Sequence, residues 1–192
     1  SSRGLGDVYK RQRDYSGPNF SNGIISKTLL KHENNAGIQG FIFNTRKEIF
    51  QNKKVRRAIT LAFDFEWSNK NLFYNQYQRC TSYFSNSELS ANNPPTIDEI
   101  NMAESLGIPS NKIINKDLTF MSRSTSSRAN LIKAKKIFDD LGWKVRENVL
   151  YNTNGTPIEF DFLLAQKGFE RILAPFAKNL KKLGIQLNYR TI

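Results

Sequence analysis

The chain has very little of the chemistry that enzymes and metal sites use most often. Its 192 residues include one cysteine, Cys80, and one histidine, His32. A single cysteine excludes an internal disulfide and a cysteine metal cluster. A catalytic triad built on histidine would have to use His32, which has no serine–glycine motif beside it. We therefore predict no catalytic residue and no metal site, and we interpret Cys80 as a small packed side chain.

Long apolar runs and phosphate-binding motifs are also absent from the sequence. No run approaches the ~18 apolar residues that a membrane-spanning helix needs, and no export signal is visible. The sequence contains no glycine-rich phosphate loop, no zinc spacing and no calcium loop. Hydrophobic residues make up 39% and aromatic residues 12% of the chain, which is typical of a globular protein. The sequence thus predicts a globular protein without a cofactor.

Positive charge is what the chain has in excess. With 29 basic and 17 acidic residues, its formal net charge is +12. Such a charge would suit a nucleic acid or an anionic membrane as partner. A solvated basic surface explains the same charge more simply. The densest basic clusters are Lys53-Lys54 with Arg56-Arg57, and Lys181-Lys182. We interpret the first cluster as a solvated helix face.

The stretch from Gly40 to Lys70 is the most informative part of the sequence. Gly40–Thr45 is short, apolar and β-branched, which predicts a strand buried in a sheet. Asn52 can cap the helix that follows. Apolar residues recur there at helical spacing, which gives the helix one buried face: Val55, Ala58, Ile59, Ala62 and Phe63. Asp64 can cap a second helix over Phe65–Tyr77.

Two further groups have both a structural and a functional interpretation. Asp64 and Glu66 could share acid–base chemistry, but a helix start favours acidic residues for electrostatic reasons alone. Five aromatic residues crowd one third of the chain: Trp67, Tyr74, Tyr77, Tyr83 and Phe84. We expect most of them to be core residues, with a minority lining a cleft.

The rest of the chain carries clear signals for helices, turns and strands. Thr96-Ile97-Asp98-Glu99 is a capping box for a helix that should end at Gly107. A second helix with apolar residues from Leu131 to Leu141 should end at Gly142. Asn154-Gly155 predicts a hairpin between Val149–Tyr151 and an alternating strand. A helix follows that strand and should end at Gly184, with a kink or restart at Pro175. A closing strand comes next, and this order of strand, helix and strand predicts a parallel crossover.

The amino-acid sequence of the central stretch resembles that of a known family. The stretch consists of a strand ending in FNT, a loop, the string VRRAI and a helix that ends in an acidic residue. This order is similar to that in the bacterial extracellular solute-binding proteins, family 5. The string LAFDFEWSNKNLFYNQYQRCTSYFSNSELSA resembles its Yej-type branch, which serves peptides and microcin C. The resemblance can be followed from Asp14 to Ile192. It implies an α/β fold: a partial second lobe of a two-lobed periplasmic-binding-protein type II (cluster C) fold, with a mixed sheet flanked by helices.

The resemblance also implies a division of the chain. Residues 1–12 do not resemble the family, and we interpret them as a non-native, adapter-derived segment. Residues 13–39 would return from the first lobe. Residues 40–192 would form the second lobe, truncated at its C-terminal end, and the export signal of a periplasmic protein would lie outside the chain.

The function implied by the resemblance is binding, not catalysis. The protein would be the solute (oligopeptide) binding component of an ABC transporter, delivering extended peptides to permease subunits in the inner membrane. We expect a monomer with no nucleic-acid partner. The expected ligand-binding residues are Gly40, Ile42, Tyr83, Asn86 and Ser87, with backbone contact favoured at the first two. The alternative, based on the +12 charge, is a basic nucleic-acid-binding module.

Overall fold

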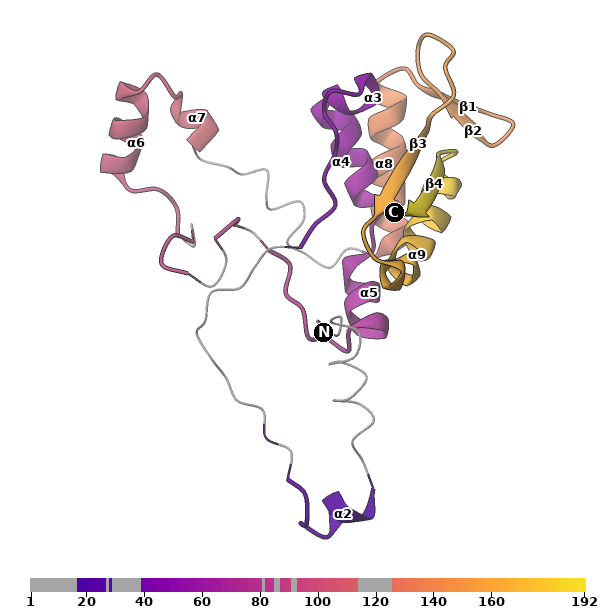
Figure 1. The fold of residues 1–192 in the computed structure, drawn as a ribbon. Coiled ribbons are helices and arrows are strands. Elements are labelled where there is room, and N and C mark those ends of the chain that lie inside the picture. Colours follow the sequence, from indigo (N-terminus) through magenta and orange to yellow (C-terminus); the bar gives the residue numbers. More distant parts are fainter. Residues whose placement is uncertain are drawn as a thin grey trace. The chain divides into compact units, whose positions relative to one another are not determined.

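The computed structural model describes residues 17–26, 28, 39–80, 82–84, 87–90, 93–113 and 126–192. The chain divides into two units, whose helices and strands are labelled in Figure 1. Unit 1 contains the described residues between 42 and 77 and between 126 and 192, and unit 2 those between 15 and 41 and between 78 and 123. The segment 1–12 and His32 lie outside the described residues. The predicted domain boundaries therefore stay a prediction.

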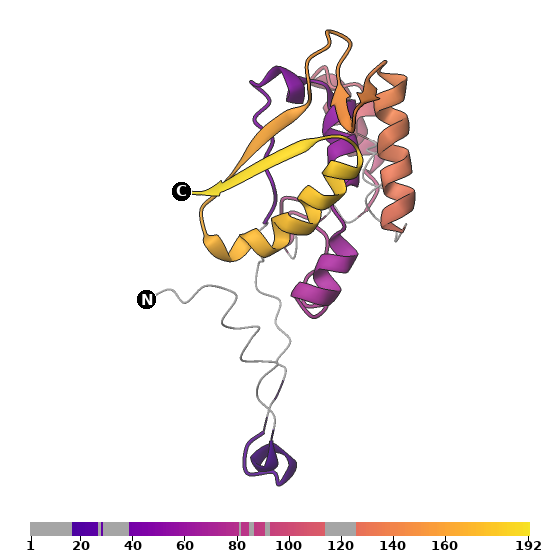
Figure 2. The ribbon, with the colours of Figure 1, turned by 90° about the vertical axis from the view of Figure 1, so that its right-hand side faces the viewer.

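Unit 1 is a mixed α/β structure. Its elements are α3 (Glu48–Gln51), α4 (Lys53–Leu61), α5 (Phe65–Leu72), α8 (Ser127–Asp140), β1 (Lys144–Arg146), β2 (Val149–Tyr151), β3 (Glu159–Leu164), η2 (Lys167–Phe169), α9 (Glu170–Lys182) and β4 (Gln186–Thr191). The strand β3 pairs in parallel with β4, with Phe160 opposite Leu187. The helix α9 connects them and packs on β4 (Figure 2). This confirms the predicted parallel strand–helix–strand unit, and α9 runs through Pro175 without a restart.

The helices α4 and α8 pack against each other through the faces that the sequence predicts. Ala58 on α4 and Ala134 on α8 are completely buried, and side chains this small let two helices approach closely. Asn52 caps α4, because its Oδ1 accepts a hydrogen bond from the Lys54 amide at 2.9 Å. Gly142 follows α8 with φ +77°, the left-handed conformation that ends a helix.

A buried amide on α9 joins this helix to the packed pair α4 and α8. Asn179 on α9 is buried, and its Nδ2 donates to the Ala62 carbonyl at the end of α4, 3.0 Å away. The Nζ of Lys182 donates to the other end of the same amide, Asn179 Oδ1, at 3.1 Å. Next to this contact, the rings of Phe63 and Phe176 meet edge to face at 5.7 Å. One polar and one aromatic contact therefore hold α4 on α9.

The chain makes an antiparallel turn on each side of β2. β2 pairs antiparallel with β1, through a turn at Glu147 and Asn148 with φ of 49° and 65°. Two successive residues with positive φ are typical of the tight turn that matches strand twist. Between β2 and β3 the chain turns at Gly155, which has φ +75°. The Asn152 amide donates to the Thr156 carbonyl, the Ile158 amide donates to the Leu150 carbonyl, and Tyr151 forms an antiparallel bridge with Pro157. The turn predicted at Asn154-Gly155 is therefore present, although β3 itself pairs in parallel with β4 and not with β2.

The turn after α9 touches the hairpin backbone. Gly184 has φ +80°, and its carbonyl accepts a hydrogen bond from the Leu150 amide at 2.8 Å. A Cβ added at Gly184 would lie 2.7 Å from the Leu150 nitrogen. The close approach of the two backbones therefore requires glycine at this position.

We predict that Gly184→Ala destabilises the chain much more than Gly155→Ala. Gly155 has a similar φ of +75° but open space around it. Both variants pay about 1–2 kcal/mol for a left-handed non-glycine residue, and Gly184→Ala adds about 1–3 kcal/mol of overpacking. Urea denaturation of both variants measures the difference. Equal losses of stability would mean that the hairpin does not press on Gly184.

The basic cluster at α4 is only partly a solvated face. Lys53 and Lys54 are exposed, but Arg56 and Arg57 are half-buried. One guanidinium nitrogen of Arg56, Nη1, donates to the carbonyls of Phe50 and Gln51 at 2.7 and 2.9 Å. These carbonyls end α3, so Arg56 caps that helix. The interpretation of the whole cluster as solvated was therefore wrong for Arg56.

We expect Arg56→Gln to lower stability by about 1–2 kcal/mol, because a hydrogen bond from a charged donor to α3 is lost. Lys54→Gln, whose side chain is exposed on the same helix, is the control. It should change stability by less than about 0.5 kcal/mol. Thermal melts of the two variants provide the comparison. If they melt together, the contacts of Arg56 contribute nothing.

Unit 2 contains short helices. They are α2 (Pro18–Ser21), α6 (Ile97–Ser105) and α7 (Ser110–Ile113). The predicted capping box is present: Thr96 Oγ1 accepts from the Glu99 amide, and the Glu99 carboxylate accepts from the Thr96 amide at 2.6 Å. These bonds from Thr96 backbone and hydroxyl lower the pKa of Glu99. Gly107, with φ +76°, follows the helix as predicted.

The aromatic third of the chain is more exposed than expected. Trp67, Tyr74, Tyr83 and Phe84 are exposed, and only Tyr77 is half-buried. The helix α5 ends at Leu72, earlier than predicted, because Tyr74 and Asn75 take positive φ. The buried Asn69 amide then holds the following loop through two hydrogen bonds to the Tyr77 backbone. Cys80 is also exposed, so the prediction of a packed thiol was wrong.

Candidate functional site

The first group of candidate residues lies in an extended segment, 39–44, and not in a strand. Residues 39–44 have no strand assignment, because their backbone groups pair with no described strand. The prediction of a buried strand over Gly40–Thr45 was therefore wrong for the described residues. The segment still alternates: Phe41 and Phe43 are half-buried, whereas Gly40 is exposed and Ile42 is 95% exposed.

Aromatic contacts attach this segment to the core of unit 1. The rings of Phe43 and Phe50 lie 5.2 Å apart, and Phe50 meets Phe160 of β3 edge to face, also at 5.2 Å. Such pairs contribute about 0.5–1.5 kcal/mol beyond their buried area. Phe43 is thus held on β3 through α3, and the Ile42 side chain faces solvent.

Asn44 closes the segment as a turn residue. Its Oδ1 accepts from the Arg46 amide at 3.2 Å and from Arg46 Nε at 3.4 Å, and its carbonyl accepts from the Lys47 amide. A side chain that bonds the backbone two residues on is the usual device of an asparagine turn. The side-chain amide of Asn44 therefore stabilises the turn that follows the segment.

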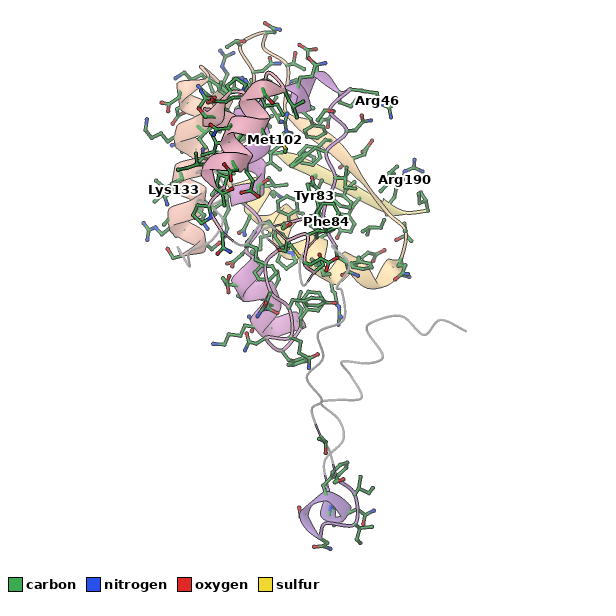
Figure 3. The ribbon with its side chains drawn as sticks, turned by 90° about the vertical axis from the view of Figure 1, so that its left-hand side faces the viewer. Arg46, Tyr83, Phe84, Met102, Lys133 and Arg190 are labelled. Carbon is green, nitrogen blue, oxygen red and sulfur yellow. The ribbon has the colours of Figure 1, made fainter. Side chains whose placement is uncertain are left out.

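The second group of candidate residues belongs to unit 2. Tyr83 is 82% and Phe84 is 56% exposed, and both side chains are labelled in Figure 3. The Ser87 hydroxyl donates to the Phe84 carbonyl at 2.6 Å, and the Phe84 amide donates to Ser82 Oγ at 3.1 Å. Two serines thus shape the turn that presents the two rings. Asn86 lies outside the described residues.

The candidate residues carry no carboxylate, imidazole, ammonium or guanidinium group. The carboxylate considered for catalysis, Asp64, accepts a hydrogen bond from the Trp67 amide at 3.0 Å and caps α5. Within the described ranges, no group of three or more histidine, cysteine, aspartate or glutamate side chains could hold a metal ion. Of the helices in the same ranges, none is both long and apolar enough to cross a membrane.

The fold is that of part of a bacterial substrate-binding protein. An oligopeptide-binding protein of Bacillus subtilis, AppA, solved with a nonapeptide, superposes with a TM-score of 0.52 at 23% identity over 78% of this chain and 25% of that chain. This likeness defines the class of the fold and no more.

The chain belongs to the bacterial extracellular solute-binding proteins, family 5, whose middle-region model matches residues 7–192. Relatives include the uncharacterized protein YejA of Escherichia coli, 35% identical over 93% of this chain. The probable peptide-binding protein YejA of Agrobacterium fabrum is also 35% identical over 93% of this chain. The chain spans about 30% of the length of each of these two relatives. The family consists of solute-binding proteins.

Sequence reasoning assigned most of the exposed aromatic side chains to the core. Trp67 and Tyr74 in unit 1 and Phe84 in unit 2 are exposed, but the sequence pattern around them is that of core residues. A non-periodic, serine-rich context was the one available signal for Phe84. Nothing in the pattern around Trp67 marks it as exposed, because exposure depends on which parts of the protein cover α5.

We predict that Asn44→Ala lowers the melting temperature of the chain, because the Arg46 amide loses its acceptor, at a cost of about 0.5–1.5 kcal/mol. Asn44→Asp keeps an acceptor at the same atom and should retain most of the stability. Differential scanning calorimetry of both variants tests this. Unchanged melting of Asn44→Ala would show that the amide is not needed for the turn.

Proposed function

We propose that the chain is part of the oligopeptide-binding component of an ABC importer. The protein would act in the periplasm, as a monomer, and deliver extended peptides to permease subunits in the inner membrane. The observation that carries the proposal is the family match over residues 7–192. It is strengthened by a relative named as a probable peptide-binding protein, 35% identical over 187 residues.

The extended segment 39–44 supports a mode of peptide binding. Gly40 and Ile42 alternate with two half-buried phenylalanines, and no described residue hydrogen-bonds to the backbone of either. An extended peptide can use such free amides and carbonyls as a strand edge, with affinity coming from main-chain hydrogen bonds. Neither Gly40 nor Ile42 offers a polar side chain, so we assign them backbone contacts.

The second group would contribute side-chain contacts. Tyr83 gives a large rigid surface for a peptide side chain at little entropic cost. Ser87, and Asn86 beside it in sequence, offer polar groups of the kind that orient a ligand in an apolar pocket. The group carries no charge, which favours recognition of the peptide by its backbone and apolar side chains. Such recognition accepts peptides of varied sequence.

The test separates backbone contact from side-chain contact at one residue. We predict that Ile42→Pro weakens peptide binding at least about tenfold, because proline removes the amide donor. Ile42→Ala keeps the amide and should bind within about threefold of the parent. Proline also suits the extended backbone of the preceding Phe41, so the fold should survive.

The measurement is an NMR titration of the 192-residue chain with a pool of tri- to octapeptides. Affinity is expected to be weak, about millimolar or −4 kcal/mol, since the chain spans about 30% of its relatives' length. Equal binding by the two variants would exclude backbone recognition at Ile42. No binding by the parent chain at ten millimolar peptide, on the order of −3 kcal/mol, would count against peptide as the ligand.

A further inference from the structure

The net positive charge of the chain lies in one of its two units. Residues 42–77 and 124–192 of unit 1 contain 19 basic and 9 acidic residues, a net charge of +10. Residues 15–41 and 78–123 of unit 2 contain six basic and six acidic residues. A charge spread for solubility alone has no reason to divide in this way. Unit 1 is therefore the part of the chain that an anionic surface would attract.

Within unit 1, the charge gathers on the two packed helices α4 and α8, which lie side by side in Figures 1 and 2. Together they carry eight basic and two acidic residues, a net charge of +6. The exposed face of the β3–β4 sheet has no excess of positive charge, because the carboxylates of Glu159 and Asp161 offset the charge of Arg190 there. In Figure 3, Lys133 on α8 and Arg190 on β4 point to opposite sides of unit 1.

Six basic side chains on these helices are exposed, and we call them the basic helix face: Lys53, Lys54, Arg128, Lys133, Lys135 and Lys136. Lys136 pairs with Asp140 at 3.0 Å, but both side chains are exposed, and such a pair contributes little. Ile132, 61% exposed, lies among these charges on α8. The face thus combines diffuse positive charge with one apolar side chain.

We propose that the basic helix face binds an anionic phospholipid surface. Five of its six charges are lysines, which are point charges on flexible stems, whereas arginine supplies the fixed geometry of specific recognition. Lysine is also depleted at protein–protein interfaces. Polybasic surfaces bind anionic lipid through summed attraction without fixed geometry. The exposed Ile132 adds an apolar contact of the kind that inserts at the lipid boundary.

The test measures binding of the 192-residue chain to vesicles. We expect binding to phosphatidylcholine vesicles with ~30% phosphatidylglycerol, little binding to phosphatidylcholine alone, and loss of binding at ~0.5 M salt. Replacing Lys54, Lys133 and Lys135 with glutamine should weaken binding at least about tenfold. Ile132→Ser should weaken it about threefold or more.

The matched control removes the same charge elsewhere in unit 1. Lys167, Lys178 and Lys181, on η2 and α9, are exposed, and their replacement by glutamine should leave vesicle binding within about threefold. All replaced lysines are exposed, so each variant should melt like the parent. An equal loss in the control variant would show that net charge acts without a specific face. Absence of binding to anionic vesicles, or displacement of vesicles by a short RNA that binds more tightly, would also overturn the proposal.

Discussion

The described part of unit 1 depends on the contact between the end of α4 and the middle of α9. The Asn179 amide is buried there and satisfied at both ends, by the Ala62 carbonyl and by Lys182. Asn179 and Ala62 are 117 residues apart in the chain. An unsatisfied amide at this depth would cost about 1–3 kcal/mol. The hydrogen bond from its Nδ2 therefore favours one position of α4 and α8 on the β3–α9–β4 unit. The rings of Phe63 and Phe176 pack edge to face beside it.

This arrangement positions the candidate peptide segment. Only Asn52, the N-cap of α4, separates α3 from α4, and Arg56 on α4 donates hydrogen bonds to the carbonyls that end α3. α3 carries Phe50, whose ring lies between Phe43 and Phe160. The segment 39–44 is therefore attached at Phe43 to a rigid core, with Ile42 turned to solvent. A binding segment on such a support is extended before a ligand arrives, which reduces the entropy that binding must overcome.

The parts predicted from the sequence are those whose determinants are local. Helical spacing from Val55 to Ala62, the capping box at Thr96 and the alternation of β3 each depend on neighbours within a few residues. The strand at Gly40–Thr45 failed because a strand requires a partner, and periodicity does not say whether one is present. The expectation that most of the five aromatic residues between Trp67 and Phe84 are buried failed for a similar reason, because burial depends on residues that are distant in the sequence. Arg56 was misjudged because its hydrogen bonds go to α3, which the charge pattern does not reveal. Of the candidate site, the sequence indicated the residues, and the structure adds the exposure of Ile42 and Tyr83 and the turn that Ser87 supports.

The account is tested most directly at the Ile42 backbone amide. Hydrogen exchange of this amide, followed by NMR with and without millimolar peptide, reports whether a peptide strand pairs with the segment. The account predicts that exchange of the Ile42 amide slows at least about tenfold near saturation, while exchange on the exposed face of α8 stays unchanged. Peptide binding that leaves Ile42 exchange unaltered, with protection elsewhere in the chain, would contradict it.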